Sequence, residues 1–516
     1  MHKCPLGRFR ACFLPAILWV VSLTLFAQPA AETHFGRVVG ETTADEIVHI
    51  YRGIPFARPP VDSLRWRAPQ PPEAWTGTKI CTTFAASPVQ RSPAPFSMWS
   101  EEFIIPKEPI SEDCLYLNVW AEARAEQQPV LVWIYGGGFN SGGSAVPVYD
   151  GEAMAREGVV FVSINYRVGP FGFLAHPELS AEAAYGSSGN YGLLDQIAAL
   201  HWVRDNIAAF GGDPDRITIA GQSAGAGSVS ALVASPLAEG LFQRAIAESG
   251  ALITWETLDL AAAEEAGRHF ADTLGVRSLA ELRKLDAATI LAAPVPQPRP
   301  IVDGYVLPLP VAELLGSERG RSVNLLTGWN ENEGLGPSGI SDAQTYRSQV
   351  EERYGEQAEN YLTYYPATND SIARRSQQDA ARDALFGIQN YTWANLHAGY
   401  AARPVYLYRF TRRVPGEGKY GDYGAFHTGE VPYAYGNLDQ SDRPWTSVDY
   451  ELSRSMLTYW VNFVKHGNPN AVGMPRWPVY SAAQKEMMIL GDRLQATVLP
   501  DADRLDFQLY LQGLQK

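Results

Sequence analysis

The sequence is poor in cysteine and lacks the short motifs of metal sites. Only 4 of its 516 residues are cysteines, and no CxxC motif, HExxH motif or histidine-rich cluster is present. Such motifs supply the sulfur and nitrogen ligands of most zinc sites. We therefore expect neither a bound metal nor a cofactor.

Basic residues are in the minority. The chain has 42 Lys and Arg against 56 Asp and Glu, a formal net charge of −14. Lys/Arg-rich runs, heptads and internal repeats are also missing. An acidic surface repels nucleic acid and anionic membranes, so neither is an expected partner.

Long apolar runs are missing except at the N-terminus. Lys3, Arg8 and Arg10 precede an almost wholly apolar run, Ala11 to Ala27, and small residues continue to Ala31. This order is typical of a cleaved secretory signal. An uncleaved anchor is the alternative, although the run is short for a spanning helix. We predict a signal peptide over 1–31, export to the periplasm or outside the cell, and one domain over 32–516.

The cysteines agree with export. Cys4 and Cys12 lie in the predicted signal, which leaves Cys81 and Cys114 in the mature chain. An even pair in an exported protein favours a disulfide. Two buried free thiols are the alternative.

Apolar runs alternate with helical segments through most of the chain. Runs that are typical of strands buried on both faces of a sheet lie at 130–135, 159–165, 217–221, 245–249, 323–328, 405–410 and 487–490. Helical spacing is found at 193–210, 224–234, 256–292 and 447–465. The alternation predicts an α/β protein with a mostly parallel, doubly wound sheet. We expect the insertions at 256–300 and 341–400 to lie over the C-terminal strand ends, where such folds place their sites.

A serine between glycines follows one of these strands. Gly221-Gln222-Ser223-Ala224-Gly225 matches G-x-S-x-G and opens a helix of small residues. That context is what a nucleophile elbow requires. Ser223 is therefore the candidate nucleophile, and it needs a base to take its proton.

Three glycines, 136–138, follow the strand at 130–135. Two backbone N–H groups of this glycine run, together with that of Ala224, can point at one oxyanion without obstruction by side chains. A phosphate-binding loop is the alternative. However, Ser141 stands where G-x-G-x-x-G requires its third glycine, and no lysine follows.

The base is expected to be a histidine late in the chain, with an acid between it and the serine. His427 lies in a glycine-flanked loop after the strand at 405–410, whereas His176 in an earlier loop is a weaker rival. Glu331 and Glu333 both follow the strand at 323–328, and their spacing leaves the choice between them open. The remaining histidines considered lie in helical patterns: His201, His269 and His397.

Together these motifs resemble the type-B carboxylesterase family, which includes cholinesterases and bacterial para-nitrobenzyl esterases. The resemblance is carried by RGIPFA at 52–57, SEDCLYLNVW at 111–120, GGGF at 136–139, NYRVGPFGFL at 165–174, GNYGLLDQ at 189–196, GQSAG at 221–225, GAFHTGEVPY at 424–433 and GNPN at 467–470. It implies the α/β-hydrolase fold and a serine carboxylic-ester hydrolase that works through an acyl-enzyme. The implied triad is Ser223, His427 and Glu333, because the acid of the family directly precedes a glycine.

The resemblance implies further roles. Gly137, Gly138 and Ala224 match the oxyanion donors, and Cys81 and Cys114 match a disulfide. Arg52 and Glu112 match a structural ion pair, and Ser249 matches a hydroxyl near the triad.

Two departures concern the substrate. Gln222 stands before the nucleophile where cholinesterases carry Glu, so a cationic choline ester loses a partner. Trp99 lies farther from Cys114 than the choline-binding tryptophan of the family. We therefore expect no cholinesterase activity. The expected partner is a small-molecule or polymer-borne ester. An amidase, thioesterase or acyltransferase with the same triad and a non-catalytic binding protein are the alternatives, and the oligomeric state stays open.

Overall fold

The computed structural model describes residues 1–2, 28–254, 257–294, 298–317, 323–334, 340–400 and 403–513. Most of the predicted signal peptide, residues 3–27, lies outside the described residues. One large hydrophobic core cluster includes residues from Ala31 near the N-terminus to Leu509 near the C-terminus. No described helix combines the length and the hydropathy that crossing a membrane requires.

An 11-stranded sheet forms the centre of the molecule, in the order β16-β15-β14-β13-β12-β11-β9-β10-β8-β4-β3. Its strands are β3 (Glu41–Thr42), β4 (Val48–Pro55), β8 (Tyr116–Glu122), β9 (Gln128–Ile134), β10 (Val160–Ile164), β11 (Gly212–Gln222), β12 (Arg244–Glu248), β13 (Asn324–Asn330), β14 (Val405–Phe410), β15 (Glu486–Leu490) and β16 (Gln495–Val498). Seven neighbouring strands of the sheet, from β10 through β9 and β11 to β15, pair in parallel. The pairs at both edges are antiparallel. The predicted mostly parallel sheet is confirmed.

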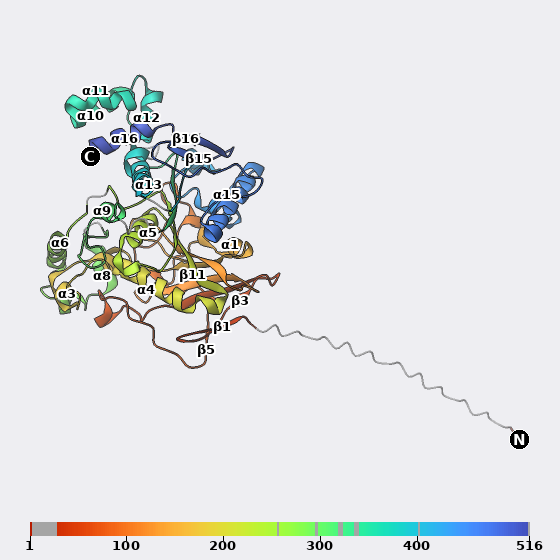
Figure 1. The fold of residues 1–516 in the computed structure, drawn as a ribbon. Coiled ribbons are helices and arrows are strands. Elements are labelled where there is room, and N and C mark those ends of the chain that lie inside the picture. Colours follow the sequence, from red (N-terminus) through yellow and green to blue (C-terminus); the bar gives the residue numbers. More distant parts are fainter. Residues whose placement is uncertain are drawn as a thin grey trace.

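Burial explains why apolar runs in the sequence located the parallel strands. All five residues of β10 and all six of β14 are buried, as a strand covered on both faces requires. In Figure 1, α4 (Tyr191–Asn206) and α5 (Ala224–Ala234) lie on one side of the sheet. Helices α1 (Glu152–Arg156) and α15 (Ser447–His466) lie on the other side.

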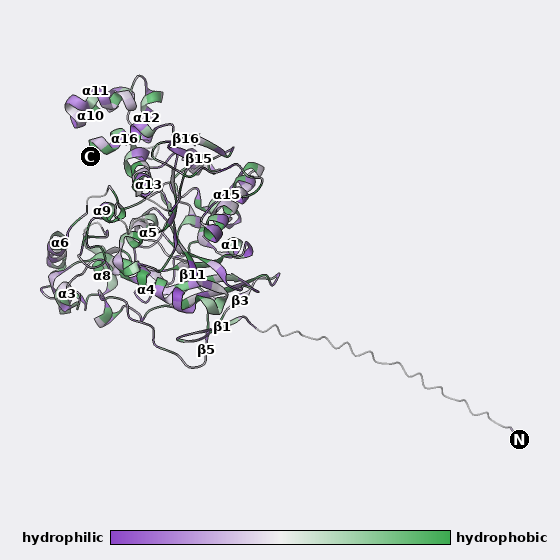
Figure 2. Ribbon diagram, in the orientation of Figure 1, coloured by the Kyte–Doolittle hydropathy of each residue, from purple (hydrophilic) through white to green (hydrophobic). Residues whose placement is uncertain are grey.

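The remaining helices lie in the connections and at the C-terminus. They are α2 (Gly169–Phe173), α3 (Pro177–Glu182), α6 (Leu260–Thr273), α7 (Leu279–Leu282), α8 (Ala287–Ala292), α9 (Val311–Leu315), α10 (Ala343–Tyr354), α11 (Ala358–Tyr364), α12 (Asp370–Arg382), α13 (Ile388–Tyr400), α14 (Val431–Ala434) and α16 (Ala502–Leu511). The predicted helical region at 256–292 is thus divided into α6, α7 and α8. Helices α10–α12 lie beside α16 at one end of the molecule, and side chains of α10, α11, α12 and α16 share a separate small hydrophobic cluster. Their ribbons alternate between hydrophilic and hydrophobic colours in Figure 2.

Short strands lie beside the main sheet. β1 (Ala30–Thr33), β2 (Gly36–Val39) and β5 (Thr78–Ile80) form a three-stranded sheet, and β6 (Ser87–Pro88) pairs with β7 (Ile110–Ser111). Ala30 and Ala31 pair with β2, and Ala31 is 3% exposed. The last two residues of the predicted signal therefore belong to the folded sheet.

The predicted disulfide is absent, because Cys81 and Cys114 are both free, buried thiols. Cys114 lines a small cavity together with Val89, and Cys81 is not part of its wall. The backbone N–H of Cys81 donates to the Val39 carbonyl, and the Cys81 carbonyl accepts from the Arg52 N–H, each at 2.7 Å. Burial raises the pKa of the Cys81 thiol to about 11.

The predicted ion pair between Arg52 and Glu112 is also wrong. The Arg52 guanidinium pairs with Glu41 and lies over the ring of Phe84. Glu112 is bound by Arg65, whose Nε donates to Glu112 Oε2 at 2.7 Å. Arg52 lies on β4 and Glu41 on β3, its antiparallel neighbour at the sheet edge, so the pairing follows the strand order.

Candidate active site

Ser223 lies at a strained turn between β11 and α5. Its backbone has φ 59° and ψ −123°, a conformation that L-residues rarely adopt. The flanking glycines make the turn possible. A Cβ atom at Gly225 would lie 2.1 Å from the Ile134 carbonyl oxygen, and one at Gly221 would lie 2.6 Å from the Gly225 backbone. The turn thus requires glycine on both sides of the serine.

His427 and Glu333 reach Ser223 from loops that follow adjacent strands. His427 Nε2 lies 2.8 Å from Ser223 Oγ, and His427 Nδ1 lies 2.6 Å from Glu333 Oε2. Glu333 follows β13 and His427 follows β14, and these strands are parallel neighbours. The carboxyl ends of parallel strands meet at one edge of a sheet, which brings the three side chains together. His427 is 7% exposed and Glu333 is 1% exposed.

The two candidate acids have different partners. Glu333 lies against His427, and its Oε1 accepts from the backbone N–H of Asn330 at 2.7 Å. Glu331 instead pairs with Arg382 at 3.2 Å and with Arg409 at 3.5 Å. Of the two glutamates, therefore, only Glu333 contacts the imidazole of His427.

The glycine loop lies beside the serine. Gly136, Gly137 and Gly138 line the same cavity as Ser223, and Gly137 and Gly138 have φ values of 111° and 62°. A Cβ atom at Gly137 would lie 2.3 Å from the Ser141 carbonyl oxygen, whereas one at Gly138 would meet nothing within 4 Å. Gly138 therefore borders open space. Such a loop leaves main-chain groups accessible to a reacting oxygen.

The imidazole of His427 contacts two aromatic rings. Trp99 lies edge-on at 6.2 Å between ring centroids, and Phe386 stacks on it at 4.3 Å. Trp99 Nε1 also donates to Thr428 Oγ1 at 3.1 Å. Phe386 was missed at the level of sequence. It lies in a single π-helical turn, η9 (Asp383–Gly387), before α13, and such turns are frequent at functional sites.

The cavity in front of Ser223 has a volume of about 440 Å³, and a neighbouring cavity is larger, at about 710 Å³. We call the smaller space, which contains Ser223 and His427, the catalytic cavity. Aromatic rings supply much of its wall: Phe96, Trp99, Phe103 and Tyr149. Its size fits a small organic molecule.

Gln222 and Ser249 are bound less closely to His427 than Ser223 and Glu333 are. Gln222 Nε2 lies 3.4 Å from both ring nitrogens of His427, and its Oε1 accepts from Thr428 at 3.4 Å. Ser249 is fully buried, and its hydroxyl has no hydrogen-bond partner among the described residues. His176, the rival base, caps α3 and accepts from the Glu178 N–H at 3.2 Å. The structure thus brings Gln222 to the histidine, whereas neither Ser249 nor His176 makes a side-chain hydrogen bond to the described part of the site.

Two buried carboxyl groups lie behind the site. Asn330 Nδ2 donates to both Glu430 and the carbonyl of Phe426, and the latter bond is 2.8 Å long. Burial raises the pKa of Glu430 well above its usual value, and the charges of Glu248 and Glu333 raise it further. Burial also raises the pKa of Glu248 to about 7. Asn330 therefore links the loop that carries the acid to the loop that carries the histidine.

A parallel sheet with a strand–serine–helix elbow, and with histidine and acid supplied by later strand ends, defines the α/β-hydrolase class. The model of the carboxylesterase family matches residues 27–508, so the chain belongs to that family. It is a carboxylesterase, an enzyme that hydrolyses carboxylic esters. Within the described residues, no cluster of three or more His, Cys, Asp or Glu side chains could hold a metal ion.

Several known proteins are similar along nearly their whole length. The fumonisin B1 esterase of Sphingopyxis macrogoltabida is 37% identical, with 93% of this chain and 91% of the relative covered. The para-nitrobenzyl esterase of Bacillus subtilis (strain 168) is 36% identical, with 92% and 96% covered. A solved structure of a PNB esterase has a TM-score of 0.78 and 34% identity, and covers 93% of this chain and 100% of that chain.

Proposed function

We propose that Ser223, His427 and Glu333 are the catalytic triad of this carboxylesterase. Ser223 Oγ attacks the ester carbonyl while His427 Nε2 takes its proton. Glu333 orients the imidazole and stabilises the imidazolium that forms. The alcohol leaves with that proton, and water then releases the acid from the acyl-enzyme in a second cycle. The observation that carries this proposal is the continuous hydrogen-bonded chain from Ser223 Oγ to Glu333 Oε2.

The oxyanion of each tetrahedral intermediate is assigned to main-chain donors. The N–H groups of Gly137, Gly138 and Ala224 are the proposed donors. The elbow strain at Ser223 and the open space beside Gly138 support this assignment. Donors that are fixed before the reaction cost no reorganisation when the charge develops.

A covalent label tests the nucleophile directly. A fluorophosphonate should add one phosphonyl group to the protein, and peptide mass spectrometry should locate it on Ser223. The Ser223→Ala variant serves as the matched control and should stay unlabelled. A label on another residue, or a label that persists in the variant, would contradict the proposal.

We also propose export as a single-domain mature protein. The pairing and burial of β1 support a cleavage that leaves Ala30 and Ala31 in place, and cleavage after Ala27 satisfies this requirement. N-terminal sequencing of the exported protein should then begin at Gln28. A mature chain that begins at Glu32 would contradict this site, and an intact N-terminus would favour the membrane anchor.

A further inference from the structure

The catalytic cavity has an unusual charge for such an acidic protein. Of the described residues that line it, only Arg91 carries a permanent charge, and none is Asp or Glu. The residue before the nucleophile, Gln222, is neutral as well. In a chain with 56 acidic and 42 basic residues, this wall offers a negative group no repulsion at close range.

Arg91 lies next to a residue that is fixed to the glycine loop. Gln90 Nε2 donates to the Gly142 carbonyl at 2.7 Å, and Gly142 N–H donates back to Gln90 Oε1 at 2.9 Å. The backbone of Arg91 is therefore anchored at the end of the loop that begins with Gly136. Its side chain is exposed and makes no ion pair or hydrogen bond with any residue that the structure describes.

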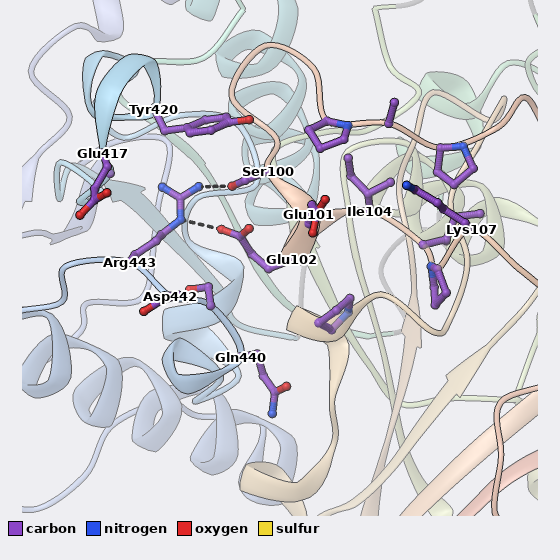
Figure 3. Close-up of a pocket in the computed structure, with 18 residues that line it drawn as sticks. Ser100, Glu101, Glu102, Ile104, Lys107, Glu417, Tyr420, Gln440, Asp442 and Arg443 are labelled. Carbon is purple, nitrogen blue, oxygen red and sulfur yellow. Dashed lines mark hydrogen bonds and ion pairs between the residues drawn. The ribbon is translucent and has the colours of Figure 1, made fainter.

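A neighbouring cation shows the contrast. A larger space, the outer cavity, adjoins the catalytic cavity. Its wall contains Arg443, and every nitrogen of the Arg443 guanidinium donates a hydrogen bond to a neighbouring group (Figure 3). Arg443 binds Glu102 at 2.6 Å, Ser100 Oγ at 2.7 Å and the Pro415 carbonyl at 2.9 Å. The buried guanidinium of Arg443 is thus bound within the wall of the outer cavity. The guanidinium of Arg91 in the catalytic cavity remains available to a ligand.

We propose that the substrates of this enzyme are esters that carry a carboxylate, and that Arg91 binds this carboxylate. A guanidinium matches a carboxylate with two parallel hydrogen bonds, so it both attracts and orients the group. The net negative charge of the protein repels anions at long range, and Arg91 opposes that repulsion at the cavity itself. This inference rests on the proposed role of Ser223, because the catalytic cavity is defined by that residue.

Two esters of similar shape test the proposal. The 4-nitrophenyl half-ester of adipic acid carries a carboxylate on its acyl chain, and 4-nitrophenyl hexanoate is its neutral counterpart. In Arg91→Ala, kcat/KM for the adipate half-ester should fall at least about tenfold, the scale of a lost charge-assisted hydrogen bond. The value for the hexanoate should stay within about twofold, since Arg91 makes no contact that the uncharged chain requires. A second pair, the butyrate esters of 4-hydroxybenzoate and 4-hydroxybenzamide, carries the same difference on the alcohol side.

The controls separate the possible failures. Lys107→Ala removes a cation from the outer cavity and should leave the ratio of charged to neutral turnover unchanged. Arg91→Glu should depress turnover of the charged esters further than Arg91→Ala does. An unchanged ratio in Arg91→Ala for both pairs, or an equal loss in Lys107→Ala, would overturn the proposal. If Ser223→Ala keeps its activity on the neutral esters, the proposed nucleophile fails, whatever Arg91 does.

Discussion

Two cavities share a wall in this molecule, and neither Ser223 nor His427 lines the larger one. The catalytic cavity measures about 440 Å³ and the outer cavity about 710 Å³. Pro93, Ala94, Ile104 and Ile105 line both spaces. The larger volume therefore does not mark the candidate active site, and the two cavities differ instead in the groups that face them.

The two walls use their polar groups differently. The outer cavity is lined by four carboxylates and two cations: Glu101, Glu102, Glu417, Asp442, Lys107 and Arg443. Its most buried charges, Glu102 and Arg443, neutralise each other. No described residue in the wall of the catalytic cavity carries a carboxylate, and Glu333 contacts His427 rather than the cavity. A buried polar chain that ends at an open cavity is available for reaction, whereas a closed pair is structural.

The sharpest test of this comparison is the removal of the nucleophile. Ser223→Ala should lower kcat on a simple aryl ester by about 10⁶, the scale of losing a triad serine. The measurement is stopped-flow and steady-state hydrolysis of 4-nitrophenyl hexanoate, with circular dichroism as a control for folding. Near wild-type turnover by a folded variant would show that another site performs the hydrolysis.

The second test separates two acids that lie two positions apart. Glu333→Gln should lower kcat by about 10⁴, because the amide no longer stabilises the imidazolium or holds its tautomer. Glu331→Gln should keep most of its activity, because Glu331 contacts Arg382 and Arg409 rather than His427. Its effect should appear as a lower melting temperature. The reverse pattern would assign the acid to Glu331.

These two glutamates also show which parts of the site could be predicted from the sequence. Both glutamates follow the same strand, so spacing could not choose between them, and the arginines that bind Glu331 lie far away in the chain. The strands were predictable because burial on both faces leaves continuous apolar runs. The elbow was predictable because its tight packing admits only glycine at 221 and 225.

Other features depended on neighbours that the sequence does not name. Phe386 stacks on His427 from a π-helical turn, and no periodic pattern predicts such a turn. The partner of Arg52 follows from strand order at the sheet edge, so a motif match assigned it to the wrong glutamate. The cysteines are an even pair in number, yet both are free, buried thiols.

A third test addresses the outer cavity. Arg443→Met leaves the Glu102 carboxylate, 11% exposed, without its partner and should destabilise the protein by about 3 kcal/mol. The double variant Glu102→Gln/Arg443→Met should recover most of this loss, as thermal unfolding would show. Turnover of a neutral ester should fall far less than in either triad variant. A loss of kcat as large as that of Glu333→Gln would mean that the outer wall is part of the catalytic arrangement, and the comparison would fail.

The smallest expected effect concerns the carboxyl groups behind the catalytic cavity. Burial raises the pKa of Glu248 from 4.5 to about 7, so the folded protein holds this proton more tightly than the unfolded chain does. The resulting stabilisation is complete below pH 4.5 and is lost as the pH rises through 7. Glu430, whose pKa is also raised by burial, acts in the same direction.

Glu248→Gln stays neutral at every pH and should escape this loss. Relative to the wild type, its melting temperature should be higher at pH 8 than at pH 5 by on the order of 2 °C. Glu101→Gln, which changes an exposed carboxylate of the outer cavity, is the matched control and should give the same difference at both pH values. If Glu248→Gln behaves like this control, Glu248 is already ionised in the folded protein at pH 5. The catalytic cavity would then be backed by a charged carboxylate rather than a neutral one, and the imidazolium that forms on His427 would gain a second negative neighbour behind Glu333.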